Sequence, residues 1–166
     1  STVDEGSVFW FSLPLSEAAL DSDLPSTTDP ESPQSSASGF PEINARILYV
    51  EDNANNISLM KKVINRIPGL SMVTAPDGQT GLEMAQKDKP DVVILDINLP
   101  DISGIDVLKR LAEDEATKDI PALALSAAAT HRDIESGLDA GFRHYLTKPV
   151  DINKLVDAVR DVLDLS

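Results

Sequence analysis

The sequence predicts an α/β fold in which five parallel strands form an open, doubly wound sheet in the order 2-1-3-4-5. From Arg46 onward, short and almost uniformly apolar runs alternate with stretches of helical periodicity. Such runs are typical of strands that are buried on both faces, as in a parallel sheet. Right-handed crossovers then place helices on both faces, and 2-1-3-4-5 is a common order for five strands.

The expected strands are the five apolar runs of this region. Each is four to six residues long except the last, which is shorter, and most consist of aliphatic residues. They span residues 47–50, 70–75, 92–95, 122–125 and 145–146.

Two of the intervening helices have clear apolar stripes. The stripe of the first helix consists of Ile57, Met60, Ile64 and Ile67. The Pro68-Gly69 pair that follows predicts the end of this helix. The stripe of the last helix consists of Ile152, Leu155, Val159 and Val162. Asp151 precedes this stripe and is expected to cap the helix.

Composition argues against several classes of function. The net charge of −14 leaves no basic surplus for nucleic acid phosphates. The absence of cysteine removes disulfides and thiolate chemistry. No run approaches the roughly 18 apolar residues of a membrane span, and no basic segment typical of a signal peptide is visible. We therefore expect a cytoplasmic protein without a membrane segment, while the membrane attachment of a longer parent protein stays open.

The first 44 residues differ from the rest of the chain. They contain no Lys or Arg, and their second half is rich in Ser, Pro and Asp. Such a composition cannot bury enough apolar surface to offset the entropy of ordering. We expect a flexible linker at 16–44, after a short apolar segment within 1–15 and before a domain at 45–166.

Carboxylates follow two neighbouring strands of the predicted sheet. Glu51 and Asp52 come directly after the first strand, and Asp96 follows the third. The carboxyl ends of these strands meet at the switch point of the sheet. Three carboxylates that lie close together raise one another's pKa or require a cation, and oxygen ligands favour a hard ion such as Mg²⁺.

Two further side chains are expected at the same edge of the sheet. Ser126 follows the fourth strand, and Lys148 follows the fifth in a Lys148-Pro149 pair. The lysine supplies a fixed positive charge, and the serine supplies a hydroxyl donor. Together with the carboxylates they predict a metal-dependent phosphoryl site with an aspartate nucleophile.

These segments resemble the receiver domain of two-component response regulators. The resemblance covers Arg46 to about Leu163 and implies a flavodoxin-like, CheY-like fold that accepts a phosphoryl group from a phosphohistidine. Its segments are ILYVEDN (47–53), VVILDINLPDISG (92–104), ALALSA (122–127) and HYLTKP (144–149).

The resemblance also implies a role for each residue of the metal and acceptor site. Asp96 corresponds to the phosphoryl acceptor of the family. Asp52 corresponds to the direct Mg²⁺ ligand, and Glu51 to its partner through water. Asn98 stands where the family uses a backbone carbonyl to complete the metal coordination.

A second group of residues corresponds to the signalling parts of the family. Lys148 would contact the phosphoryl oxygens, and Pro149 would follow a cis peptide bond. Ser126 would move toward the phosphoryl group, and Tyr145 resembles the aromatic switch residue that turns inward. The resemblance thus implies switching on the face of the fourth helix, fifth strand and fifth helix.

The segment GSVFWFSLPL (6–15) resembles the last strand of the histidine kinase ATP-binding domain. ATP-binding domain, linker and receiver is the order of hybrid histidine kinases. We therefore expect a carboxyl-terminal piece of such a kinase, with no output domain after the last helix. The expected partners are the phosphodonor domain of the same parent chain and a histidine phosphotransfer protein. The fragment would itself catalyse only its own phosphorylation and dephosphorylation.

Two alternatives remain open at this stage. A degenerate receiver would act as a docking module without phosphorylation, but it usually lacks the acceptor, the acid pair or the lysine. A haloacid dehalogenase-type phosphatase also uses an aspartate nucleophile and Mg²⁺, but it requires Asp-x-Asp, whereas Asn98 stands two residues after Asp96. His131 and His144 have no second ligand at metal-binding spacing and are expected to be ordinary surface residues.

Overall fold

The computed structural model describes residues 42–127 and 130–164. The expected kinase strand within 1–15 and the linker up to residue 41 lie outside the described residues. At the amino-terminal end of the described chain, Ile43 is already buried in the core, and its backbone amide donates to the Pro68 carbonyl oxygen at 2.8 Å.

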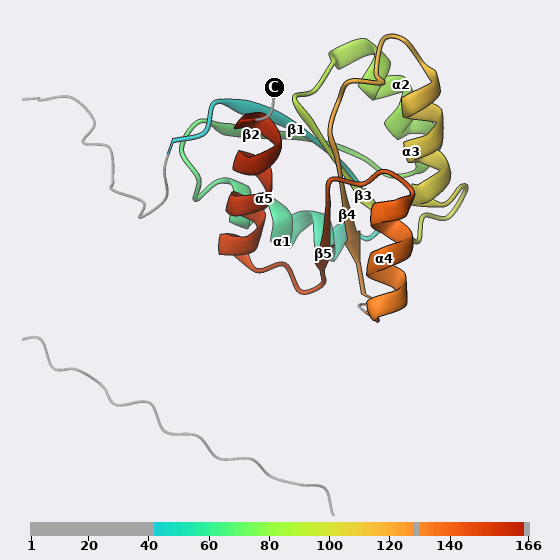
Figure 1. The fold of residues 1–166 in the computed structure, drawn as a ribbon. Helices are drawn as coiled ribbons and strands as arrows, with labels where there is room; N and C mark the ends of the chain where they lie inside the picture. The colour runs from blue at the N-terminus through green and yellow to red at the C-terminus, as the bar shows by residue number, and fades with distance from the viewer. Residues whose placement is uncertain (1–41, 128–129, 165–166) are drawn as a thin grey trace, which may run out of the picture. The chain divides into compact units, whose positions relative to one another are not determined.

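Five parallel strands form one sheet in the order β2-β1-β3-β4-β5, which confirms the predicted fold (Figure 1). The strands are β1 (Ala45–Val50), β2 (Leu70–Ala75), β3 (Val92–Asp96), β4 (Ala122–Ser126) and β5 (His144–Thr147). β1 pairs with both β2 and β3. The strand order therefore reverses between β1 and β3, and at their carboxyl ends such a sheet opens a crevice.

Helices cover both faces of this sheet. They are α1 (Ala54–Ile64), α2 (Gly78–Asp88), α3 (Gly104–Glu113), α4 (His131–Asp139) and α5 (Ile152–Asp164). α1 and α5 pack on one face, and α2, α3 and α4 pack on the other (Figure 1). None of the described helices is both long and apolar enough to cross a lipid bilayer.

The alternation of side chains along residues 47–50 of β1 shows why this run is uniformly apolar, whereas Arg46 at the start of the strand is exposed. Ile47 and Tyr49 belong to the core cluster under α1 and α5. Leu48 and Val50 belong to the cluster under α2 and α3. Because successive side chains of a strand point to opposite faces, the part of a strand that is covered on both sides has no position for a solvated residue.

The predicted end of the first helix is wrong by three residues. α1 ends at Ile64, and Ile67 lies beyond it in a turn. Backbone bonds from Arg66 to Val63 and from Ile67 to Ile64 tighten the chain there. This turn returns the Ile67 side chain to the core, where it is buried, so its spacing imitates a further helical position.

The start of the last helix agrees with the prediction. An Asp151 carboxylate oxygen accepts hydrogen bonds from the backbone amides of Asn153 at 2.8 Å and Lys154 at 3.3 Å. These bonds satisfy amides that have no partner within the helix. Leu155 and Val159 are buried against the sheet. α5 thereby fixes the loop that leads from β5 and carries Lys148.

Candidate functional site

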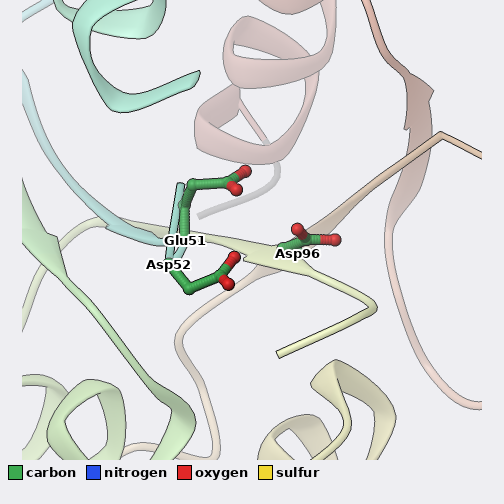
Figure 2. A group of neighbouring side chains, drawn as sticks. All are labelled: Glu51, Asp52 and Asp96. Atoms are coloured by element: carbon green, nitrogen blue, oxygen red, sulfur yellow. The ribbon is translucent and has the colours of Figure 1, made fainter. Parts of the chain in front are cut away.

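Three carboxylates meet at the carboxyl ends of β1 and β3. Glu51 and Asp52 follow β1, and Asp96 is the last residue of β3 (Figure 2). One oxygen from each of the three side chains can be chosen so that all lie within 4.8 Å of one another. The pairing of β1 with β3 is the cause, because it brings together strand ends that are far apart in the sequence.

Glu51 is fully buried and accepts hydrogen bonds on both carboxylate oxygens. Its Oε2 accepts from the Tyr49 hydroxyl at 2.7 Å and from Lys148 Nζ at 2.5 Å. Its Oε1 accepts from Asn56 Nδ2 at 2.9 Å and from the backbone amide of Asn53 at 3.2 Å. Burial acts to raise the pKa of Glu51, but hydrogen bonds from these side chains outweigh it and hold the pKa below its ordinary value. Glu51 is therefore an ionised carboxylate inside the protein.

The pKa of Tyr49 is shifted in the opposite direction to that of Glu51. Its side chain is almost fully buried. Burial, together with the hydrogen bond to Glu51 and the negative charge of the nearby carboxylates, raises the pKa of the Tyr49 hydroxyl well above its ordinary value. Tyr49 consequently remains a protonated donor to Glu51 throughout the ordinary pH range.

Lys148 bridges two of the three carboxylates. Its Nζ donates to Glu51 at 2.5 Å and to Asp96 Oδ2 at 2.7 Å, and only 18% of its side chain is exposed. Burial acts to lower the pKa of Lys148, but the hydrogen bonds and charges of Asp96 and Glu51 raise it above its ordinary value. The peptide bond between Lys148 and Pro149 is cis, which is the isomer that the resemblance implies.

Asp96 and Asp52 are less completely enclosed by hydrogen-bond donors. Asp96 is 5% exposed, and its Oδ1 accepts from the backbone amide of Asn98 at 3.0 Å. Asp52 faces solvent. Three clustered carboxylates with one lysine leave a net negative charge, and their hard oxygen ligands suit Mg²⁺. The donor set therefore fits the expected ion.

Ser126 and Tyr145 lie on the strands next to this cluster. Ser126 is the last residue of β4 and is buried, and its carbonyl oxygen accepts from the Lys148 backbone amide at 2.8 Å. Tyr145 lies on β5 and is half-buried. Its ring lies against Gly137 of α4, where a Cβ atom would come within 2.6 Å of the ring carbon Cδ2.

Of the two histidines, His144 has a described contact. His144 Nε2 lies 2.8 Å from Asp161 Oδ2, which links β5 to α5 at the surface. His131 is exposed at the start of α4. The structure brings neither residue into the carboxylate cluster.

Tyr49 and Asn56 are parts of the site that the sequence motifs do not indicate. The apolar run of residues 47–50 predicts only a strand position for Tyr49, although this residue stands two residues before Glu51. Side chains with this spacing point to the same face, so the spacing could have suggested a contact. No comparable signal marks Asn56, because its contact depends on how α1 packs beside β1.

Known proteins resemble this chain over the same region. A family profile described as the response regulator receiver domain matches residues 47–160. The polar-differentiation response regulator DivK of Brucella anthropi is 30% identical over 117 residues, which cover 70% of this chain and 94% of DivK. The response regulator PleD of Caulobacter vibrioides is 35% identical over 120 residues, which cover 72% of this chain and 26% of PleD.

Solved structures agree with these sequence matches. The receiver domain of Francisella response regulator 1452 has a TM-score of 0.67 at 27% identity and covers 74% of this chain and 98% of its own. The Vibrio cholerae chemotaxis protein CheY4 has a TM-score of 0.66 at 27% identity and covers 73% of this chain and 100% of its own.

Proposed function

This chain belongs to the response regulator receiver family, and on that basis we propose that it accepts a phosphoryl group from a phosphohistidine onto Asp96 in a Mg²⁺-dependent reaction. The observation that carries the proposal is the contact of Lys148 with both Glu51 and Asp96 beside the exposed carboxylate of Asp52. This arrangement combines a nucleophile, a fixed cation and ligands for a metal ion in one crevice.

The reaction is an in-line displacement at phosphorus. A carboxylate oxygen of Asp96 forms a bond to phosphorus while the bond between phosphorus and the donor's imidazole nitrogen breaks. The electron pair of the broken bond stays on the imidazole, and the product is an aspartyl phosphate. The ammonium group of Lys148, which neutralises Asp96 before the reaction, shifts its contact to the oxygens of the incoming phosphoryl group.

Asp52, Asp96 and the backbone carbonyl of Asn98 would hold the metal ion, and Glu51 would act through water. Mg²⁺ would neutralise negative charge on the phosphoryl oxygens as they approach the carboxylates. The hydrogen bonds to Glu51 keep that carboxylate in one orientation, so the protein does not have to reorganise it during transfer.

The new phosphoryl group would change the neighbouring strands. It adds about −1.5 to −2 charge and strong acceptor oxygens. Ser126 would hydrogen-bond to this group, and Tyr145 would turn inward and alter the face formed by α4, β5 and α5. A local change in charge would thereby bias an element with two conformations.

The donor would dock beside α1. An apolar hollow of about 310 Å³ lies between α1 and the segment after β5, and Lys148 is at its edge. Leu59 of α1 lines this hollow and is 48% exposed. A partner helix that presents a phosphohistidine next to apolar side chains would fit this surface, as expected of a histidine phosphotransfer protein or of the parent's phosphodonor domain.

We also propose that the chain is the carboxyl-terminal piece of a cytoplasmic part of a hybrid histidine kinase. The support is the resemblance of residues 6–15 to the last strand of a kinase ATP-binding domain, followed by a receiver. The coding sequence upstream of Ser1 tests this proposal. It should encode an ATP-binding domain and a helix with a phosphorylatable histidine, and a different upstream domain would contradict it.

Intact mass after incubation with acetyl phosphate tests the acceptor chemistry. The wild-type chain should gain one phosphoryl group with Mg²⁺ and none with EDTA, and alkali should remove it. Asp96→Asn should gain none while keeping the circular dichroism spectrum of the wild type. Absence of labelling in the wild-type chain would favour a docking module, and labelling of Asp96→Asn would mean that another residue is the acceptor.

A further inference from the structure

The loop between β3 and α3 begins at the carboxylate cluster and is held at both ends. The backbone amide of Ile97 donates to the Leu125 carbonyl oxygen at 3.3 Å, and the Gly104 amide donates to the Ile97 carbonyl oxygen at 3.0 Å. A Cβ atom at Gly104 would collide with the carbonyl oxygen of Asp96. The loop thus closes tightly on the end of β3, and it carries the Asn98 peptide.

The Asp101 side chain ties the middle of this loop to a different helix. Its Oδ1 accepts a hydrogen bond from the backbone amide of Gly78, and its Oδ2 accepts one from the backbone amide of Gln79, both at 2.9 Å. Both donors belong to the first turn of α2, where backbone amides have no partner within the helix. The side chain of Asp77, the residue before the helix, accepts a hydrogen bond from the backbone amide of Thr80 at 2.7 Å. Two carboxylates therefore share the start of α2, and Asp101 reaches it from 22 and 23 residues away.

The contact between the β3–α3 loop and the start of α2 is close as well as polar. A Cβ atom at Gly78 would come within 2.5 Å of Ile102 Cγ1 and 2.7 Å of Val107 Cγ2. Glycine thus lets the start of α2 approach the loop. Although Asp101 is exposed, slight desolvation acts to raise its pKa, but the hydrogen bonds from the backbone amides of α2 hold the pKa below its ordinary value. The charged form of Asp101 is the one that makes these contacts.

We propose that Asp101 is a positioning residue for phosphoryl transfer, which fixes the β3–α3 loop on α2 and thereby holds the Asn98 peptide beside Asp96. This inference rests on the proposed function. The loop has another anchor near the site, the bond from the Asn98 amide to Asp96 Oδ1. That anchor uses the carboxylate that reacts, so it weakens when Asp96 engages a cation or a phosphoryl group. The two bonds of Asp101 are independent of the reacting carboxylate.

The test compares Asp101→Asn with the matched control Asp77→Ala. The asparagine amide keeps one acceptor oxygen and turns an NH₂ group toward a backbone donor, so it loses half of the contact without a change in size. The control removes a cap from the same end of α2 and leaves the loop untouched. Both variants are measured for thermal stability, for Mg²⁺ binding by NMR titration, and for labelling by acetyl phosphate against Mg²⁺ concentration.

Asp101→Asn should need about tenfold more Mg²⁺ for half-saturation, as is typical when a group that orients metal ligands is removed. Its labelling rate at saturating Mg²⁺ should stay close to that of the wild type. Hydrogen exchange of the amides of residues 97–103 should be faster without any Mg²⁺. Asp77→Ala should lower thermal stability while keeping the Mg²⁺ dependence and the loop exchange of the wild type.

Wild-type Mg²⁺ affinity and loop exchange in Asp101→Asn would overturn the inference, and so would an equal shift in Asp77→Ala. Failure of the proposed function has a different signature, because the wild-type chain itself would then remain unlabelled at every Mg²⁺ concentration. Even in that case, direct Mg²⁺ binding and hydrogen exchange would still decide the role of Asp101.

Discussion

At the scale of single residues, the site depends on how a buried carboxylate is kept ionised. Glu51 carries its charge inside the protein because Tyr49, Asn56 and Lys148 donate to it. An unpaired buried charge would instead take up a proton or destabilise the fold. These hydrogen bonds also fix the orientation of the Glu51 carboxylate. Through its bond to Lys148, Glu51 in turn holds that lysine next to Asp96.

Glu51 makes the stability of the domain depend on pH. Because its folded pKa lies below the ordinary value of 4.5, the unfolded chain binds this proton more readily. The stabilisation is therefore complete above about pH 4.5 and is lost as the pH falls toward the folded pKa. In Glu51→Gln, the free energy of unfolding should decline less steeply below pH 4.5, by up to about 1.4 kcal/mol per pH unit.

Urea denaturation followed by circular dichroism across this range measures the difference. Glu135→Gln is the matched control, since Glu135 is exposed on α4. The control should follow the wild-type pH profile. Parallel profiles for Glu51→Gln and the wild type would show that Glu51 is not the group that loses its charge.

At the scale of elements, α1 and α4 each place an exposed leucine on a different face of the domain. Leu59 of α1 is 48% exposed and Leu138 of α4 is 45% exposed. Leu59 lines the hollow beside Lys148, whereas Leu138 does not. The two residues therefore form a matched pair for locating the donor's docking surface.

Leu59→Arg should slow phosphoryl transfer from a histidine phosphotransfer protein by tenfold or more, because losing an apolar contact and burying a charge together cost about 1.4 kcal/mol or more. Transfer from acetyl phosphate should be unchanged, since that donor needs no docking surface. Rates of both reactions are measured by intact mass. Leu138→Arg should leave both rates near those of the wild type. Slower transfer from the phosphotransfer protein in this variant alone would indicate that the docking surface lies on α4.

α4 also contains a glycine that propensity does not favour. Gly137 is buried in the last turn of the helix, and glycine within a helix costs up to about 1 kcal/mol relative to alanine. The Tyr145 ring occupies the space that a Cβ atom would need. The absence of a side chain thus lets the ring of Tyr145 lie directly on the helix.

Gly137→Ala should fail to gain the usual 1 kcal/mol or so of stability, because its methyl group must displace the Tyr145 ring. The ring resonances of Tyr145 should shift in NMR spectra, and urea denaturation should give a stability no higher than that of the wild type. Ser136→Ala, at the exposed neighbouring position, should show only the effect of helix propensity. Unchanged Tyr145 resonances together with a full gain in stability would contradict the contact.

At the scale of the whole molecule, folding itself assembles the acidic site. Asp52 and Asp96 become neighbours only when β1 and β3 pair. An ion that binds this cluster therefore binds the folded chain and not the unfolded one. Such an ion stabilises the fold in proportion to the logarithm of its concentration.

Mg²⁺ should raise the free energy of unfolding by about 1.4 kcal/mol for each tenfold increase in concentration above its dissociation constant. EDTA should abolish the effect, and Asp52→Ala should strongly reduce it because a carboxylate ligand is lost. Glu135→Ala changes the net charge equally and should respond to Mg²⁺ like the wild type. Urea denaturation at several Mg²⁺ concentrations provides the measurement, and a flat wild-type response would exclude a Mg²⁺ site of useful affinity.

Local sequence determined the architecture and the identity of the acidic residues. Uniformly apolar runs identify strands buried on both faces, and the acids that end them must lie at the carboxyl edge of the sheet. The apolar spacing does not reveal that α1 ends at Ile64, because a tight turn can return a side chain to the core at a spacing that imitates a helix.

Only the tertiary structure decided which side chains hold these acids in place. The donors to Glu51 include Tyr49, two residues away, and Lys148, 97 residues away. Asp101 caps a helix that starts 23 residues before it. Strand and helix patterns arise from burial and neighbouring residues along the chain, so one sequence reveals them. Hydrogen bonds across the fold depend on which strands pair and how closely helices approach, and these distances exist only once the chain has folded.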